Sequence, residues 1–245
     1  MRIAVAGGTG AIGQHVVREA RARGHEPVVL ARSEGVDLTT GSGLEDRLVD
    51  VATVVDVTNI ASQSRTKATA FFETVTRTLQ EAERRAGVGH HLALSIVGID
   101  RVSMGYYQAK LAQEHVVESG PVPCTILRAT QFYEFVEQAL RFAAIGPVSL
   151  VPRFPDQPVA AADVAATLLD QVESGPSGRV PDLAGPAVLD LLDLARRVNA
   201  AKGLGRRIVP VRMPGRAGRA MRAGGLLPDS DGPRGATTFD EWLAG

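Results

Sequence analysis

Two side chains that can together deliver a proton stand four residues apart, at positions 106 and 110. Residues at this spacing are neighbours on one face of a helix, so Tyr106 and Lys110 would lie side by side. A tyrosine hydroxyl can act as a general acid when a nearby cation makes its phenolate easier to form, and Lys110 would supply that cation. The pair indicates reduction of a carbonyl group, a reaction in which a hydride donor must lie beside the phenol. Tyr107 is offset by one position and is expected to point elsewhere.

The first thirteen residues indicate where that hydride donor would bind. Residues 2–6 are an apolar run suited to a buried strand, the segment 7–13 (GGTGAIG) follows, and apolar residues then recur at helical spacing up to Gly24. In such a strand–turn–helix unit the first glycine allows a tight turn, the second lets a pyrophosphate approach the backbone, and the third lets the helix pack on the strand. The amide groups that begin the helix would bind the phosphates. The sequence thus predicts a dinucleotide site made by Gly7, Thr9, Gly10, Ala11, Ile12 and Gly13.

The residues after the second expected strand distinguish the two nicotinamide dinucleotides. A site that prefers NAD usually has an acidic residue about 20 positions past the glycines, where it accepts a hydrogen bond from the ribose 2′-hydroxyl. This chain has Arg32 and Ser33 there, and a guanidinium can bind a phosphate through two hydrogen bonds. We therefore expect NADP(H) rather than NAD(H); the alternative is an arginine that is merely solvated. Further cofactor contacts are expected from Asp37, Thr58, Asn59 and Lys110.

The order of expected elements predicts an α/β fold. Strands are expected at 2–6, 27–31, 36–38, 53–57, 92–97 and 124–128, and helices at 12–24, 68–86, 106–117 and 132–143. This alternation is typical of a Rossmann-type doubly wound parallel sheet with both faces covered. Beyond residue 146 we expect strands at 148–151, 157–159, 180–184 and 207–211, helices at 163–172 and 190–201 with Asp190 as N-cap, and a capping box from Thr238 to Glu241. Residues 1–146 would form the NAD(P)-binding core and 147–245 a small C-terminal substrate-binding portion, integrated with the core as a single domain.

The composition argues for a cytoplasmic protein. The 27 basic and 27 acidic residues balance, so no global charge favours nucleic acid or an anionic membrane. We expect no signal peptide and no transmembrane helix, and the single Cys124 is interpreted as a buried core thiol in a reducing compartment. His90 and His91 are expected in a loop and bind no metal. The basic run 206–222 is interpreted as a solvated face or a clamp for an anionic substrate, in preference to a nucleic-acid patch.

Four segments of the chain resemble a known family. They are GGTGAIG at 7–13, LSIVGID at 94–100, YYQAK at 106–110 and LRATQFYEF at 127–135. They are similar to the short-chain dehydrogenase/reductase superfamily and, within it, to its atypical NmrA-like NAD(P)H-binding group. The resemblance implies a Rossmann fold, NADP(H), Tyr106 as acid/base and Lys110 as its partner. The third catalytic residue of the superfamily is often the second serine of a pair, but here Ile96 follows Ser95, so Ser95, Ser103 or neither completes the set.

Two functions of different classes follow from these features. The first is an NADPH-dependent oxidoreductase that reduces a small organic carbonyl or quinone, with Tyr106 as proton donor. The second is a non-catalytic NADP(H)-binding redox sensor that regulates a partner protein, and epimerisation or dehydration on the same fold is a third reading. Gln131 and Phe132 follow a strand at its carboxyl end and are candidates for substrate contact, with residues 210–233 as a mobile cover around at most one short helix. The expected partner is a small-molecule substrate, with no nucleic acid or membrane, and a homodimer is left open.

Overall fold

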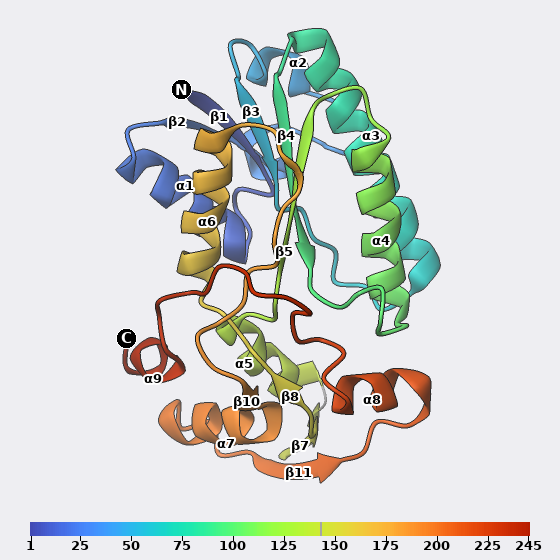
Figure 1. Cartoon of the computed structure of the whole chain (residues 1–245), viewed down its shortest axis with the longest axis vertical. Helices are drawn as coiled ribbons and strands as arrows, with labels where there is room; N and C mark the ends of the chain where they lie inside the picture. Colours follow the sequence, from blue (N-terminus) through green and yellow to red (C-terminus); the bar gives the residue numbers. More distant parts are fainter. Residues whose placement is uncertain (143) are drawn as a thin grey trace.

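The computed structural model describes residues 1–142 and 144–245, and a six-stranded parallel sheet lies at its centre (Figure 1). The strand order is β2-β1-β3-β4-β5-β9, and every neighbouring pair is parallel. The strands of this sheet are β1 (Arg2–Ala6), β2 (Glu26–Leu30), β3 (Thr53–Asp56), β4 (His90–Ile96), β5 (Cys124–Ala129) and β9 (Gly178–Arg179).

Helices cover both faces of the sheet. Helices α1 (Ala11–Ala22) and α6 (Ala161–Ser174) lie on one face, and α3 (Arg65–Ala86) and α4 (Gly105–Glu118) lie on the other, with the short α2 (Leu44–Arg47) beside α3 (Figure 1). Successive residues of β1 point to opposite faces, because side chains alternate along a strand. Ile3 and Val5 therefore pack with α1 and α6, and Ala4 and Ala6 pack on the opposite face. The near-continuous apolar runs of the sequence follow from burial on both sides.

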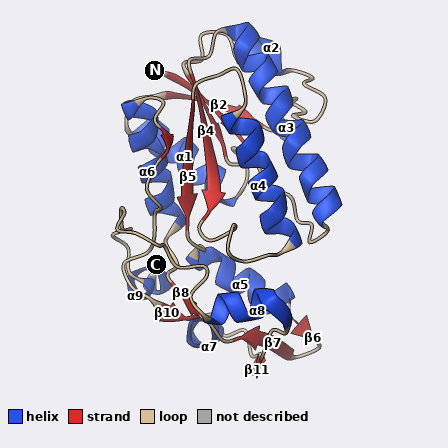
Figure 2. Ribbon diagram, turned by 45° about the vertical axis from the view of Figure 1, so that its right-hand side comes forward, coloured by secondary structure: helices blue, strands red, loops and turns tan. Residues whose placement is uncertain are grey.

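The C-terminal portion lies beyond the carboxyl ends of β4 and β5 (Figure 2). It begins with α5 (Tyr133–Phe142) and contains a three-stranded sheet, in the order β11-β7-β6, and a two-stranded one that pairs β10 with β8. Its other elements are β6 (Ala144–Ile145), β7 (Val148–Pro152), β8 (Pro155–Asp156), β10 (Leu189–Asp190), α7 (Leu191–Ala201), β11 (Arg207–Val211), α8 (Gly215–Arg222) and α9 (Phe239–Ala244). Between these elements the chain returns to the core to form α6 and β9, so residues beyond 146 complete the central layers.

Most of the expected elements are confirmed. Strand β11 has the predicted bounds, Asp190 caps α7 by accepting from the backbone N–H of Leu192, and Thr238 and Glu241 form the predicted capping box. Helix α3 begins at Arg65, three residues before the prediction, because Ser64 supplies a side-chain cap to the N–H of Lys67.

Several expectations are wrong. The segment 36–38 is not a strand, because Asp37 only bridges Ser42 in a turn. In place of strands at 157–159 and 180–184 the structure has β8 and β9, with single bridges at Val159, Leu183 and Ala184. The helix predicted to 143 ends at Phe142, and Ala143 lies outside the described residues.

Two further corrections concern single side chains. His90 and His91 are the first residues of β4 and are buried, so they do not lie in a loop. Cys124 is a free thiol that is only half-buried at the start of β5. No helix in the described part of the chain combines the length and hydrophobicity needed to cross a membrane.

Candidate active site

A glycine turn joins β1 to α1 and is packed too closely for side chains. Gly7 has φ +79° and donates its N–H to the carbonyl of Leu30 at 3.0 Å. A Cβ on Gly7 would lie 3.1 Å from Cα of Thr58, and a Cβ on Gly13 would overlap the carbonyl oxygen of Gly7. The helix can therefore start directly above the strand only because these positions are glycine.

The first turn of α1 offers an exposed set of backbone amides. Gly10 is the N-cap, has extended backbone angles and provides no side-chain cap, so the amides that follow keep their hydrogen-bonding capacity. Thr9, Gly10 and Ala11 are exposed, and Gln14 fixes the turn by donating from Nε2 to the carbonyl of Thr9 at 2.9 Å. A helix N-terminus without side chains binds phosphate well. The predicted glycine-turn residues thus fit a dinucleotide pyrophosphate.

The segment 32–37, which follows β2, carries charges of both signs. Arg32 and Ser33 lie exposed in a single 3₁₀ turn (Arg32–Glu34). Asp37 lies nearby, and its carboxylate accepts from the N–H and hydroxyl of Thr39 at 2.8 and 2.6 Å. These hydrogen bonds, together with a smaller attraction from Arg32, lower the pKa of Asp37. Arg32 is exposed and available to an incoming phosphate, but an anion lies close to it.

Tyr106 and Asn59 meet at the carboxyl edge of the sheet. Tyr106 lies in the first turn of α4, and its hydroxyl donates to Oδ1 of Asn59, beyond the end of β3, at 2.6 Å. Its ring packs edge-on against Phe72 of α3, with 5.8 Å between ring centres. Burial raises the pKa of Tyr106 to about 12. This shift is opposite to the one that a neighbouring ammonium would cause, so the phenolate of Tyr106 is not made easier to form here.

Lys110 points into the protein instead of toward Tyr106. Its Nζ donates to the carbonyl of Leu94 in β4 at 2.8 Å and to Oε1 of Gln113, and it lies 4.7 Å from the ring centre of Phe72. Burial lowers its pKa to about 8. Among the described residues no hydrogen bond joins Lys110 to Tyr106. The helical spacing places the two on neighbouring turns, but each side chain has its own partner.

The two candidate serines lie in different environments. Ser95 is 2% exposed, and its hydroxyl has no hydrogen-bond partner in the described part of the chain. It is in register with Arg128 of β5, whose guanidinium pairs with Glu114 of α4, so Ser95 also faces α4. Ser103 is exposed and accepts from Nε2 of Gln108 at 2.9 Å. Ser95 lies under α4, and Ser103 lies on the surface of the loop before it.

The substrate candidates border a polar cluster that the sequence did not indicate. Nε2 of Gln131 is 3.4 Å from the hydroxyl of Tyr107, and Phe132 is partly buried beside the core. Tyr107 points toward the C-terminal portion, away from the partners of Tyr106, as its offset predicted. Asp156 of β8 lies near Tyr107 and is 1% exposed, and burial raises its pKa to about 7. Asp156 carries no sequence signal, because a strand of only two residues brings it there.

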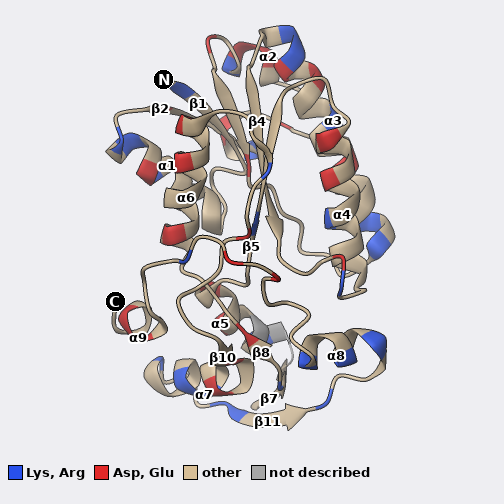
Figure 3. Ribbon diagram, viewed as in Figure 1, with Lys and Arg blue, Asp and Glu red and all other residues tan. Residues whose placement is uncertain are grey.

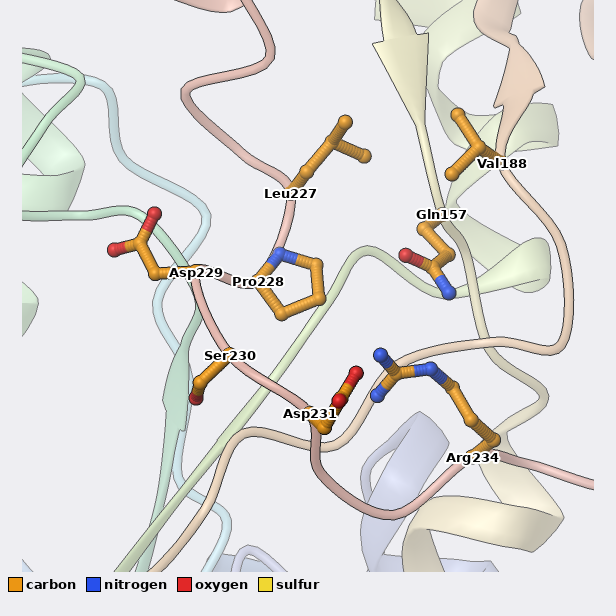
Figure 4. Close-up of a pocket in the computed structure, with 8 residues that line it drawn as sticks. All are labelled: Gln157, Val188, Leu227, Pro228, Asp229, Ser230, Asp231 and Arg234. Atoms are coloured by element: carbon orange, nitrogen blue, oxygen red, sulfur yellow. The ribbon is translucent and has the colours of Figure 1, made fainter.

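The segment 210–233 covers this region from the other side. It contains one helix, α8, and its buried Met221 and Leu226 pack with Tyr107. Arg101 anchors it by donating to the carbonyl of Leu227 and pairing with Asp229. An open depression of about 400 Å³ lies alongside the segment, bordered by Gln157, Val188, Leu227, Pro228, Asp229, Ser230, Asp231 and Arg234 (Figure 4).

Three basic residues of this segment are exposed to solvent. Figure 3 shows basic side chains on α8. Arg212, Arg216 and Arg219 are exposed, whereas Arg222 is partly buried and donates to the carbonyl of Met213 at 2.9 Å. No ion pair in the described part of the chain involves them. The expected cover is thus an anchored segment with an uncompensated basic face.

Solved structures share this fold at low sequence identity. MoeE5, solved with UDP-glucuronic acid and NAD, superposes with a TM-score of 0.74 at 17% identity, covering 100% of this chain and 97% of its own. A short-chain dehydrogenase/reductase superfamily protein from Agrobacterium tumefaciens with bound NAD gives a TM-score of 0.68 at 20% identity, covering 100% and 95%. The Thermus thermophilus UDP-glucose 4-epimerase complex with NAD gives 0.67 at 20%, covering 100% and 99%. At these identities the likeness establishes the fold alone.

The sequence itself matches a protein family. No curated protein matches the chain. The model of a family described as NAD(P)H-binding matches residues 7–175, which include the glycine turn, the Tyr106 helix and the strands β2, β3, β4 and β5 of the central sheet. The chain therefore belongs to the NAD(P)H-binding family, with the Rossmann-type fold of the short-chain dehydrogenases/reductases that its sequence resembles.

Proposed function

We propose that the protein is an NADPH-dependent oxidoreductase that reduces a small organic carbonyl or quinone, with Tyr106 as the proton donor. The observation that carries the proposal is the position of the Tyr106 hydroxyl. It is held by Asn59 at 2.6 Å and lies at the edge of the sheet where Rossmann-type folds bind their ligands. The glycine turn that fits a pyrophosphate lies at the same edge.

The chain's own residues would supply orientation and a proton. The bound nicotinamide would supply a hydride to the carbonyl carbon. Tyr106 would then give its proton to the carbonyl oxygen, so that one hydride and one proton complete the alcohol. Asn59 sets the direction of the hydroxyl, and Gln131 with Phe132 would border the substrate. Lys110 would bind the nicotinamide ribose after its ammonium leaves the carbonyl of Leu94.

The redox sensor remains the second candidate because of two side chains. Lys110 points inward, and Ser95 is buried under α4. A protein that only senses the ratio of oxidised to reduced cofactor does not need either group at the reacting atoms. Cofactor-retaining epimerisation, the third candidate, would need the same phenol and would leave the NADPH concentration unchanged.

Consumption of NADPH separates the reductase from the other two candidates. The absorbance of NADPH would be followed in the presence of a panel of quinones, ketones and aldehydes, with Tyr106→Phe as the matched inactive variant. We expect at least one substrate class to be reduced at a rate that depends on Tyr106. Cofactor binding without turnover of any panel member would contradict the reductase and is the result expected of both the sensor and the epimerase.

Arg32 should set the choice between the two cofactors. A charge-assisted pair of hydrogen bonds to the 2′-phosphate contributes on the order of 1.5–3 kcal/mol, which corresponds to roughly a 10- to 100-fold preference for NADPH. Arg32→Asp should remove most of this preference and weaken NADH binding much less. Fluorescence titration of both cofactors measures the two dissociation constants.

Arg77→Asp is the control for this substitution. It makes the same charge change at an exposed position of α3, away from the glycine turn, and should leave the cofactor preference intact. Equal affinity of the unmodified protein for NADPH and NADH would contradict the assignment of Arg32.

A further inference from the structure

Three buried polar side chains form a chain of hydrogen bonds between the sheet and α4. Asp56, the last residue of β3, is 1% exposed, and its Oδ2 accepts from Nε2 of Gln113 at 2.9 Å. The other end of that amide, Oε1, accepts from the ammonium of Lys110. A carboxylate and an ammonium are thus joined through one amide whose two ends match their charges. The reverse orientation of the amide would direct its N–H groups at the ammonium and its oxygen at the carboxylate.

The second oxygen of Asp56 holds the loop that carries Asn59. Oδ1 accepts from the N–H of Thr58 at 2.9 Å and from its hydroxyl at 2.7 Å. The next residue, Asn59, accepts from the hydroxyl of Tyr106. Hydrogen bonds thus link Tyr106 to the loop of Asn59, this loop to Asp56, and Asp56 through Gln113 to Lys110. One turn of α4 connects Lys110 to Tyr106, so these residues form a closed ring of contacts.

In the described part of the chain, two further ion pairs lie near Asp56 and Lys110. Glu114 of α4 lies one turn beyond Lys110, but its carboxylate is paired with Arg128 of β5 at 2.6 Å. On the far side of Asp56, Glu83 of α3 pairs with His91 of β4 at 2.9 Å, and both are fully buried. Glu114 is paired with Arg128, and His91 faces both Glu83 and Asp56. Asp56 is the buried carboxylate that reaches Lys110 through a hydrogen-bonded amide.

The energetic problem for Lys110 is its burial. Taking an ammonium out of water favours its neutral form, and this loss lowers the pKa of Lys110, whereas Asp56 and Glu114 oppose the change. The ring of Phe72 and the carbonyl of Leu94 supply weaker stabilisation to the same ammonium.

We propose that Asp56 and Gln113 are positioning residues that keep the buried Lys110 charged and fix its ammonium in register with the loop of Asn59 and Tyr106. This inference deepens the proposed function, because it concerns the lysine that would serve the cofactor. Asp56 does not touch the reacting atoms, and it acts only through Gln113 and Thr58.

The small number of lysines makes a direct test feasible. Lys67, Lys110 and Lys202 are the lysines of the chain, so a protein labelled with ¹³C and ¹⁵N in lysine gives three side-chain signals, and Lys110→Met assigns one of them. Lys67 is exposed and serves as the internal reference, whereas the ammonium of Lys202 is paired with Glu137 at 2.7 Å. Burial should make Lys110 titrate below Lys67 in the cofactor-free protein.

Asp56→Asn should lower the pKa of Lys110 by roughly 1–3 units, because it removes the compensating charge and directs an amide N–H at Gln113. Gln113→Leu should lower it in the same direction, and it provides a second variant if Asp56→Asn fails to fold. The control is Glu118→Gln, which removes a carboxylate from an exposed position of α4 and should leave the pKa unchanged. An unchanged Lys110 pKa in folded Asp56→Asn would overturn the proposal.

The pH dependence of NADPH binding separates this proposal from the proposed function. If Lys110 serves the cofactor, binding should weaken as pH rises through the pKa of Lys110, and it should weaken at lower pH in Asp56→Asn. A shifted Lys110 titration with no matching shift in cofactor binding would support the role of Asp56 and contradict the role of Lys110 in binding. An unchanged Lys110 titration in Asp56→Asn would overturn the role of Asp56, irrespective of the result for cofactor binding.

Discussion

Replacing Tyr106 with phenylalanine should reduce turnover by roughly 10²–10⁴-fold, the effect typical of a lost acid/base group. The substitution removes the hydroxyl that donates to Asn59 and keeps the ring that packs on Phe72. Folding and NADPH affinity should therefore survive. The expected result is a fall in kcat for NADPH oxidation, with an unchanged dissociation constant from fluorescence titration.

Tyr107→Phe is the matched control for this variant. It makes the same change at the adjacent residue, whose hydroxyl faces Gln131 and the C-terminal portion. Its effect on kcat should be much smaller than that of Tyr106→Phe. Full activity of Tyr106→Phe, or a larger loss in Tyr107→Phe, would assign the proton donor elsewhere.

Replacing Arg128 with leucine should lower the free energy of unfolding by about 3–5 kcal/mol, the usual cost of removing one partner of a buried ion pair. Arg128 donates from Nε and Nη2 to the two oxygens of Glu114 at 2.7 and 2.6 Å, and both side chains are buried between β5 and α4. Without Arg128, the carboxylate of Glu114 would stay buried with no ion-pair partner, and Asp100 would lose its contact with the same guanidinium. Urea denaturation followed by circular dichroism measures the loss.

Arg84→Leu provides the comparison in an exposed setting. Arg84 also donates twice to one carboxylate, that of Glu81, but both side chains are about half exposed. This loss should be about 0–1 kcal/mol, because water already solvates both charges. Replacing Glu114 together with Arg128 should recover part of the larger loss, since no unpaired charge is then buried. Equal losses from Arg84→Leu and Arg128→Leu would contradict the argument.

The elements that could be predicted from the sequence are those determined by local chemistry. The glycine turn at 7–13 is required by close backbone contacts, and the capping box at Thr238 and Glu241 lies within one helical turn. The alternation of apolar strands and amphipathic helices predicted the parallel sheet. Where the apolar signal was short, as at 36–38, a turn formed instead of a strand.

The directions of the polar side chains could not be predicted, because their partners come from distant segments. Helical spacing predicted that Tyr106 and Lys110 lie side by side in one helix; both are in α4, but each side chain has a different partner. It could not reveal that Asn59, 47 residues away, holds the phenol, or that the carbonyl of Leu94 and the amide of Gln113 hold the ammonium. His90 and His91 looked like polar loop residues for the same reason, since the buried partner of His91 is Glu83 on another element.

The pairing of α1 with α6 has a consequence for synthesis on the ribosome. Val16 and Val17 of α1 share one apolar cluster with Val164 and Leu168 of α6, although about 150 positions separate them. At 5–20 residues per second, the nascent helix would wait roughly 10–30 s before its partner emerges. During that interval the apolar side chains of α1 that later pack on α6 are exposed to water. The nascent chain therefore offers a binding site for a chaperone, and this site is buried only when α6 docks.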